Sequence, residues 1–407
     1  MNNINNQILK EIKPTKEQEL FVKRETSAFL KSLNKNLKNA KAVVGGSFEK
    51  NTWLSGNYDV DIFVKFDYKK YKDIDISKEL EKSLKKIKKT KVHGSRDYFQ
   101  VKHGKFNFEI VPVLDIKNYK EAMNVTDISP LHSRFIKNNS NKKIQDDIRL
   151  AKQFLRSNEL YGAESHIRGF SGYLIELLII YYNGFDNFIK NVSKWKENEI
   201  IDIKKHYKNK TDLLLSLNAS KLGPLIVIDP MQKNRNVAVA LSKEKYDLIK
   251  NISNKYLKKS SIEYFKIKEF DVSKYKNSII IEIIPKSGKA DIIGSKIYKL
   301  FESMKFRINE EGFALNDFGW HYDKKTYLWF TPKEMEINKL KKHFGPFIED
   351  YENMKKFRAK WTSYKIYEEK GKSYVIVERK FYRLNDLIIN LIKDKSINKY
   401  TKFIKRL

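Results

Sequence analysis

GGSFEKNTWLSGNYDVDIF, residues 45–63, holds more information about the fold than any other stretch of this chain. The residues just before it, Ala42-Val43-Val44, favour a strand, and the alternating run 58–66 at its end favours a second one. Between these strands, glycine-containing turns enclose a segment that favours a short helix. The stretch therefore predicts strand, turn, short helix, turn and strand, within a mixed α/β domain.

Two carboxylates lie two residues apart on the second predicted strand. Successive side chains of a strand point to opposite faces, so Asp59 and Asp61 share one face while Val60 and Ile62 turn to the core. Like charges this close raise each other's pKa unless a cation lies between them, and their hard oxygen atoms suit Mg²⁺. Such a pair is common by itself, so its weight comes from its neighbours in the sequence.

The chain in front of these acids is suited to phosphate. Gly46-Ser47 stands at the junction of strand and helix, where free backbone N–H groups and the Ser47 hydroxyl can hold a triphosphate. The combination predicts a phosphate cradle and a pair of metal-binding acids on one wall of a cleft.

A third carboxylate is available at Glu109. The runs 98–102 and 106–113 flank His103-Gly104-Lys105 and predict a hairpin, in which Glu109 points away from its apolar neighbours. With three acids, one metal ion can activate an attacking hydroxyl and a second can hold the triphosphate and its leaving pyrophosphate. The alternative for Glu109 is an exposed polar residue on a half-buried strand.

Helical periodicity surrounds these strands. Residues 5–37 predict a leading helical element, and residues 76–89 predict a basic helix. From about Ile144 the apolar residues recur with a helical period, and the run 173–182 is apolar nearly all round, like a helix at the centre of a helical domain. Glu176 within that run needs a partner.

The last third of the chain alternates strand-like and helical runs, which predicts a small α/β sandwich whose sheet is covered on one side. The strand-like runs are 278–284, 326–330, 363–367 and 374–381, and the helical runs are 292–304 and 332–343. Residues 384–407 predict one more basic amphipathic helix.

Composition limits the class of partner. Lys and Arg number 82 against 50 Asp and Glu, a net charge of +32, whereas an ordinary small domain carries about 2 to 8. This charge attracts a polyanion, although a gene rich in A and T would also spread lysine through the chain. The absence of cysteine excludes disulfides and thiolate metal sites, and no apolar run reaches the ~18 residues that span a bilayer. We expect a cytoplasmic protein that is neither secreted nor embedded in a membrane.

These motifs resemble those of the archaeal-type (class I) CCA-adding enzymes, the tRNA nucleotidyltransferases of the polymerase-beta-like superfamily. The signature G-S-x-x-K-x-T-x-L-x-G-x-x-D-x-D-x-F runs from Gly46 to Phe63, and further blocks of that family follow in the same order. These blocks are Ser129-Pro130-Leu131-His132, Arg149-Leu150-Ala151-Lys152, Tyr161-Gly162-Ala163-Glu164, Arg168-Gly169-Phe170-Ser171-Gly172-Tyr173, Asp229-Pro230 and Arg235-Asn236-Val237-Ala238.

The resemblance implies an α+β multidomain fold with a nucleotidyltransferase head (1–140), a helical neck (141–256), and an α/β, RRM-like body and tail (257–407). It implies template-independent addition of C, C and A to the 3′ end of tRNA from CTP and ATP, with two Mg²⁺ ions. The matching residues are Asp59, Asp61 and Glu109 for catalysis and metal, Ser47, Lys50, His132, Lys152 and Tyr161 for the nucleotide, and Arg235 near the base.

The sequence departs from the family pattern at two of these positions. Lys50 stands where close relatives often have Arg, and Glu109 stands where Asp is more usual. A lysine offers a point charge instead of a two-pronged donor, and a longer Glu arm changes how far the carboxylate reaches. The C-terminus is also shorter than in larger members, which bears on how the distal tRNA elbow is held.

Other interpretations of the same residues stay open at this point. His132 can be a cap or core histidine, Lys152 a solvated lysine on a charged helix face, and Tyr161 a simple packing residue. The whole chain can be another template-independent polymerase, such as a poly(A) polymerase, or a non-catalytic RNA-binding protein. The sequence also leaves open whether two copies form a homodimer.

Overall fold

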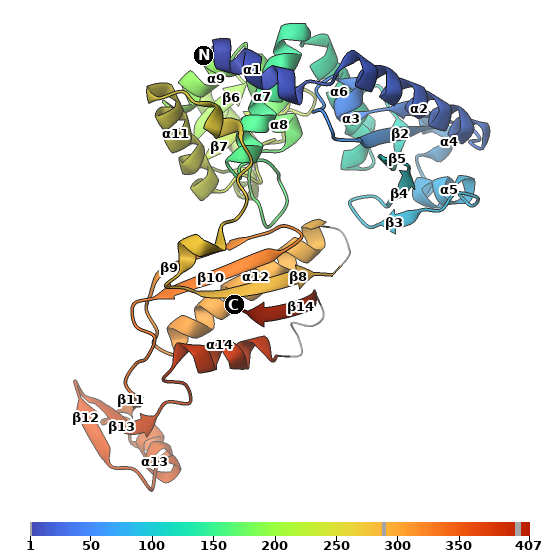
Figure 1. Ribbon diagram of the computed structural model, residues 1–407. Coiled ribbons are helices and arrows are strands. Elements are labelled where there is room, and N and C mark those ends of the chain that lie inside the picture. The colour runs from blue at the N-terminus through green and yellow to red at the C-terminus, as the bar shows by residue number, and fades with distance from the viewer. Residues whose placement is uncertain (1, 287–289, 395–399) are drawn as a thin grey trace. The chain divides into compact units, whose positions relative to one another are not determined.

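The computed structural model describes residues 2–286, 290–394 and 400–407. The chain divides into two compact units, Met1–Lys268 and Glu269–Leu407 (Figure 1). The first unit joins a mixed sheet to a set of helices, and the second contains further sheets with their own helices. The predicted α+β class is confirmed. In the residues described, no helix is long and apolar enough to cross a membrane.

The leading helical element consists of α1 (Asn2–Ile12) and α2 (Lys16–Lys35). The chain turns between them at Pro14, which has no N–H to donate to a continuing helix. Thr15 then caps α2 by accepting a hydrogen bond from the Gln18 backbone N–H, and the Gln18 side chain accepts one from the Thr15 N–H.

The sheet of the first unit has the strand order β1-β2-β5-β4-β3. Its strands are β1 (Ala40–Val44), β2 (Asp59–Asp67), β3 (Thr90–Val92), β4 (Tyr98–His103) and β5 (Phe106–Asp115), and the intervening helices are α3 (Gly46–Glu49), α4 (Tyr68–Tyr71) and α5 (Ile76–Ser83). The predicted strand, short helix and strand are β1, α3 and β2. The predicted hairpin is β4 and β5, which turn at Gly104. The predicted basic helix is shorter than expected, because α5 ends at Ser83.

One face of this sheet is apolar and covered. Val60 and Ile62 of β2 and Phe108 and Ile110 of β5 are fully buried, and α2 and α5 add apolar side chains to the same cluster. This burial fixes which way the alternating residues point. The acids of β2 and β5 are therefore directed to the opposite face.

The helical part of the first unit surrounds α8. Its elements are α6 (Ser129–Asn138), α7 (Lys142–Ser157), α8 (Gly172–Tyr181), α9 (Phe185–Val192), β6 (Glu199–Asp202), α10 (Lys210–Ser216), β7 (Leu225–Ile228) and α11 (Lys243–Lys258), with 3₁₀ turns at Tyr119–Glu121, Val125–Ile128, Ala219–Lys221 and Ile262–Phe265. The predicted stripe on α7, from Ile144 to Leu155, is buried, and α8 is buried on nearly all sides, as its apolar sequence predicts.

The second unit begins with a 3₁₀ turn and a sheet in the order β14-β8-β10-β9. The elements are Val272–Tyr275 (3₁₀), β8 (Ile279–Pro285), α12 (Ala290–Glu310), β9 (Leu315–His321), β10 (Thr326–Pro332), α14 (Leu384–Ile392) and β14 (Thr401–Arg406). Apolar side chains of α12 and α14 pack with those of β8 and β10 in one cluster. A smaller sheet, β11-β13-β12, consists of β11 (Leu340–Phe347), β12 (Ile366–Glu369) and β13 (Lys372–Glu378) and packs against α13 (Tyr351–Lys360).

The prediction of a single sheet in this unit was wrong, because the predicted strands fall in two sheets. Two further predictions were also wrong. Residues 332–343 do not form a helix: the chain leaves β10 and enters β11, and Met335 and Leu340 are exposed, so no buried stripe of helical spacing forms there. Residues 384–407 do not form one helix either. α14 ends at Ile392, and β14 pairs with the edge of β8, whose backbone N–H and C=O groups find partners in this pairing. Residues 395–399, which the predicted helix included, lie outside the described part of the chain.

A buried arginine joins the helical part to the sheet of the first unit. The Arg149 guanidinium on α7 donates to the backbone oxygens of Trp53 and Asn51, at 3.0 and 2.7 Å, and to Asp146 at 2.7 Å. Only 1% of Arg149 is exposed. Its planar donors thus hold the chain segment that follows α3.

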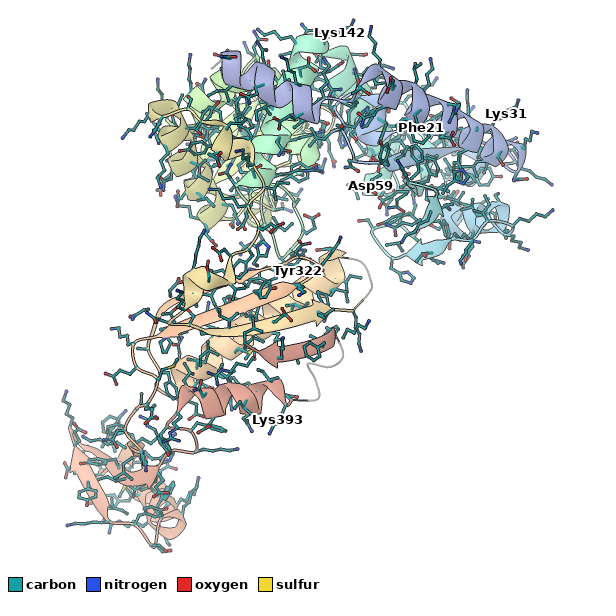
Figure 2. The ribbon with its side chains drawn as sticks, in the orientation of Figure 1. Phe21, Lys31, Asp59, Lys142, Tyr322 and Lys393 are labelled. Carbon is teal, nitrogen blue, oxygen red and sulfur yellow. The ribbon has the colours of Figure 1, made fainter. Side chains whose placement is uncertain are left out.

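We expect Arg149→Met to destabilise the first unit by about 3 kcal/mol, because it leaves buried carbonyl oxygens without donors. Hydrogen exchange of the α7 amides measures this loss within that unit. Lys142→Met, at an exposed position of the same helix labelled in Figure 2, serves as the matched control and should change the value by less than about 0.5 kcal/mol. Equal exchange rates in both variants would contradict the role of Arg149.

Candidate functional site

Three carboxylates project from neighbouring strands of the first unit. β2 and β5 run parallel, and their register sets Asp61 opposite Glu109 and Asp59 opposite Asn107. Gln100 on β4 donates to Glu109 at 2.8 Å, and Asn107 donates to Asp59 at 3.3 Å. Asp59, labelled in Figure 2, lies at the start of β2 and is exposed. The sheet therefore brings together the acids that the sequence singles out.

The electrostatics of Asp61 suit a cation. Burial and the nearby charge of Glu109 raise its pKa to about 6, although Lys50 acts in the opposite direction. All the donors are carboxylate oxygens, which hard divalent cations prefer. In the described residues, no three acidic or histidine side chains stand close enough to form a complete ion site. The three acids supply the type of ligand that a divalent ion prefers, and they lie on the same face of the sheet. To bind one ion together, their side chains have to turn toward each other.

A glycine turn fits closely against Asp61. Gly46 has a φ of +58°, and a Cβ on it would lie 1.6 Å from the Asp61 Oδ2 atom. A Cβ on Gly45 would lie 2.3 Å from the ring of Phe63. Only glycines allow the chain to pass this close to β2, and the turn thereby carries Ser47, the second residue of α3, past the acids.

Two lysines share one buried carboxylate beside this turn. Glu176 of α8 accepts from Lys50 at 2.6 Å and from Lys152 at 3.0 Å, and it also accepts from the Thr52 hydroxyl at 2.9 Å. Lys152 donates in addition to the backbone and side-chain oxygens of Thr52. The partner that Glu176 needs is thus a pair of lysines. The interpretation of Lys152 as a solvated lysine was wrong, because the residue is buried.

The two ion pairs change the acidity of both partners. Burial lowers the pKa of Lys152 to about 8, even though the charge of Glu176 raises it. Burial alone would raise the pKa of Glu176, but the charges of Lys152 and Lys50 outweigh it and lower the pKa to about 2. Glu176 therefore stays ionised at neutral pH.

A second polar cluster is organised by Asp229. This fully buried carboxylate lies 2.6 Å from the Arg235 Nη1 atom, 2.9 Å from the His132 Nε2 atom and 3.3 Å from the Tyr173 hydroxyl. The imidazole ring of His132 also stacks on Tyr173, with centroids 4.3 Å apart. His132 is accordingly a largely buried histidine paired with a carboxylate, and Arg235 is held by the same anion.

Tyr161 is enclosed beside these clusters. The Arg156 guanidinium lies 4.7 Å from the centroid of its ring. The hydroxyl lies so close to Gly172 that a Cβ there would be 3.2 Å from it. Burial is the main reason why the pKa of Tyr161 is raised.

Lys50 lies close to the acids of the sheet and to both polar clusters. Burial has the largest influence on the pKa of Asp61, His132, Lys152 and Tyr161, and the positive charge of Lys50 lowers all four. An electrostatic effect of this kind requires proximity. The predicted site residues therefore converge within the first unit, with Arg235 joined to them through Asp229 and His132.

Sequence reasoning missed several residues of this site. Thr52 was recognised only as part of a motif, and Asp229 and Tyr173 only as members of matching blocks. Gln100, which holds Glu109, was not noticed at all. The one signal available was the charge of Glu176 inside an apolar run, because a buried carboxylate implies cationic partners nearby.

Family models match most of the chain in three segments. Residues 24–124 match the nucleotidyltransferase domain, residues 146–266 the second domain of tRNA nucleotidyltransferase, and residues 285–402 the C-terminal domain of the CCA-adding enzyme.

Solved structures show the same fold at low sequence identity. A cytoplasmic RNA terminal U-transferase aligns with a TM-score of 0.52 at 13% identity, over 66% of this chain and 98% of that one. The Cid1 poly(U) polymerase aligns with a TM-score of 0.52 at 14% identity, over 65% of this chain and 98% of the other. Likeness at this level establishes the fold alone, and it agrees with the nucleotidyltransferase head expected from the motifs.

Curated relatives extend over nearly the full length. The CCA-adding enzyme of Nanoarchaeum equitans is 37% identical over 90% of this chain and 91% of its own length. That of Sulfurisphaera tokodaii is 30% identical over 93% of this chain and 89% of its own. That of Methanocaldococcus jannaschii is 28% identical over 97% and 92%. The resemblance found in the sequence is confirmed, and this chain belongs to the family of CCA-adding enzymes.

Proposed function

We propose that this chain adds C, C and A in turn to the 3′ end of tRNA, using CTP and ATP without a nucleic-acid template and releasing pyrophosphate. Relatives that carry the name CCA-adding enzyme match it along nearly its whole length. The observation that supports the chemistry best is the set of three carboxylates on one face of β2 and β5, next to the lysines around Glu176. With tRNA as substrate, we also assign the enzyme to the cytoplasm.

Asp59, Asp61 and Glu109 are the residues that would hold two Mg²⁺ ions. Bound there, the ions would activate the 3′ hydroxyl of the RNA and stabilise the charge that develops on the pyrophosphate. The residues of the chain prepare this step: β2 and β5 keep the acids in register, and Gln100 holds the longer Glu109 side chain by its Oε1 atom.

The triphosphate would lie against the cationic side of the site. Ser47, Lys50, His132, Lys152 and Tyr161 form the proposed nucleotide-binding set. Lys50 has one carboxylate partner, and its side chain is 11% exposed, so it can also meet a phosphate. Lys152 already uses its three N–H groups on Thr52 and Glu176, so a phosphate has to displace one of these partners to bind it directly.

Arg235 would contact the base of the incoming nucleotide. Asp229 fixes one side of its guanidinium at 2.6 Å, which orients the remaining donors of the planar group. Donors held in one plane can distinguish the edges of C and A from those of other bases. The net charge of +32 suits the RNA itself, whose phosphates attract a basic surface.

The acids are tested with a tRNA that lacks its 3′ end, Mg²⁺ and labelled CTP or ATP. We expect wild-type chain to stop after CC without ATP and after CCA with both nucleotides. Asp59→Ala with Asp61→Ala should lower the rate at least about a thousandfold, because several kcal/mol of transition-state stabilisation are lost. Asp115→Ala, at the far end of β5 in an exposed ion pair with Lys65, is the matched control and should retain activity. Unlimited A tails would indicate a poly(A) polymerase, and RNA binding without incorporation would indicate a non-catalytic protein.

The glycine turn is tested by a pair of substitutions at positive φ. Gly46→Ala drives a methyl group into the Asp61 carboxylate, and a displacement of about 1 Å at a reacting centre can cost about a hundredfold in rate. Gly56→Ala meets no atom within 4 Å at a φ of +79°, so it measures the backbone strain alone. We expect CCA addition to fall about a hundredfold in the first variant and less than about threefold in the second. Equal losses in both would show that strain, not the contact with Asp61, is responsible.

A further inference from the structure

Glu176 is an unusual residue for its position. It lies on α8 in the sequence GYLIELLIIY, and its exposed fraction is 0%. A buried ion pair seldom stabilises a fold more than apolar side chains of the same volume, because removing the charges from water is costly. Stability alone therefore does not explain a carboxylate at this point of an apolar helix.

The two oxygens of Glu176 have different partners. Oε1 accepts from the Thr52 hydroxyl and the Lys152 ammonium, while Oε2 accepts from Lys50 at 2.6 Å. The Lys152 side chain is 5% exposed and the Lys50 side chain 11%. The carboxylate thus has an inner side fixed by buried groups and an outer side that holds one lysine at the edge of the site.

We propose that Glu176 is a positioning residue of the nucleotide site, whose carboxylate links Lys152 to Lys50 and sets the place at which the Lys50 ammonium meets the phosphates of the incoming nucleotide. This inference rests on the proposed function, since it concerns how the same site takes up CTP and ATP.

The charges of the cluster support this role. Lys50 and Lys152 bring two positive charges to one carboxylate, so the group carries an excess of one positive charge that an anionic ligand can neutralise. Removing Glu176 would leave two ammonium groups facing each other across a buried space, an arrangement that disfavours their charged forms.

The state of Lys152 provides a readout that simple packing would not affect. Burial and the positive charges of Lys50 and of Arg156 on α7 lower its pKa, Glu176 is the group that raises it, and the net result is a pKa of about 8. Without the carboxylate, the pKa falls below that value, and Lys152 becomes neutral at a lower pH. As the pH is raised, the affinity for a triphosphate should therefore begin to fall at a lower pH than in the wild-type chain.

The test compares Glu176→Gln with wild-type chain and with Asp147→Asn. Asp147 serves as the matched control, because it is a partly buried acid on the same helix as Lys152. It accepts a hydrogen bond from the Phe185 backbone N–H and contacts neither Lys50 nor Lys152. Isothermal titration with a non-hydrolysable CTP analogue and Mg²⁺, from about pH 6 to about pH 9, gives the affinity at each pH. Steady-state CCA addition gives KM and kcat separately.

For Glu176→Gln we expect the dissociation constant and the KM for CTP to rise about tenfold at neutral pH, with a smaller change in kcat. The loss should shrink toward acid pH, where Lys152 is protonated again, and Glu176→Asp should recover part of the affinity. Asp147→Asn should match wild type in both respects. An affinity and a pH profile of Glu176→Gln that equal those of wild type would overturn the proposal.

A second variant decides the matter if Glu176→Gln does not fold. Lys152→Met with Glu176→Met removes the buried pair without a change in net charge, a replacement that stability usually tolerates. The proposal expects this double variant to bind the CTP analogue more weakly than Lys152→Met alone, because only the double variant takes the carboxylate anchor from Lys50. Equal affinities of the two variants would refute it. Failure of wild-type chain to extend tRNA would refute the proposed function instead, while the titrations, which need no tRNA, would still test Glu176.

Discussion

The segment between α3 and β2 is held by charged groups that are buried, and the rest of the site depends on this contact. Arg149 and Lys152 of α7 donate to the backbone oxygens of Asn51, Thr52 and Trp53. Glu176 of α8 accepts from the Thr52 hydroxyl. Buried donors and acceptors that are all satisfied restrict the chain to one arrangement more strictly than apolar contacts do. The sheet that carries the acids and the helices that carry the lysines are thereby fixed to each other within one unit.

This contact gives the site two regions of opposite charge. The acids lie on the open face of β2 and β5, where Asp61 and Glu109 repel each other, and the lysines lie where α7 and α8 meet the turn. A nucleotide with its metal ions has the complementary distribution, with cations beside the reacting phosphate and negative charge along the phosphate chain. Lys50 lies between the two regions, since its charge acts on Asp61 as well as on Lys152.

Local periodicity made much of this predictable. The alternation around Asp59 and Asp61 set their common face, and the hairpin at Gly104 set the direction of β5, because both depend on neighbours in the chain. The register of Asp61 with Glu109 was not predictable in detail, since it depends on how β2 and β5 pair. The partners of Glu176 and the cluster around Asp229 join residues far apart in sequence, so only the folded chain shows them.

The misassigned segments of the second unit have a similar cause. In β11 and β14 a helical pattern was read from residues whose pairing partners, β13 and β8, lie elsewhere in the chain. Leu340 and Phe403 are exposed, so their spacing is not set by burial and carries no information on period. Patterns predict structure where a buried face imposes them, and most residues of these two strands are exposed or only half-buried.

The lysine at position 50 suits the same contact. The resemblance to the family suggests that Arg is frequent there, and a planar guanidinium tends to occupy both oxygens of a carboxylate. Lys50 takes only the Oε2 atom of Glu176, so Oε1 remains available to Thr52 and Lys152. A compact ammonium therefore allows one buried carboxylate to serve two lysines. The hydrogen bond from Gln100 likewise holds the Glu109 side chain, which stands opposite Asp61 in the paired strands.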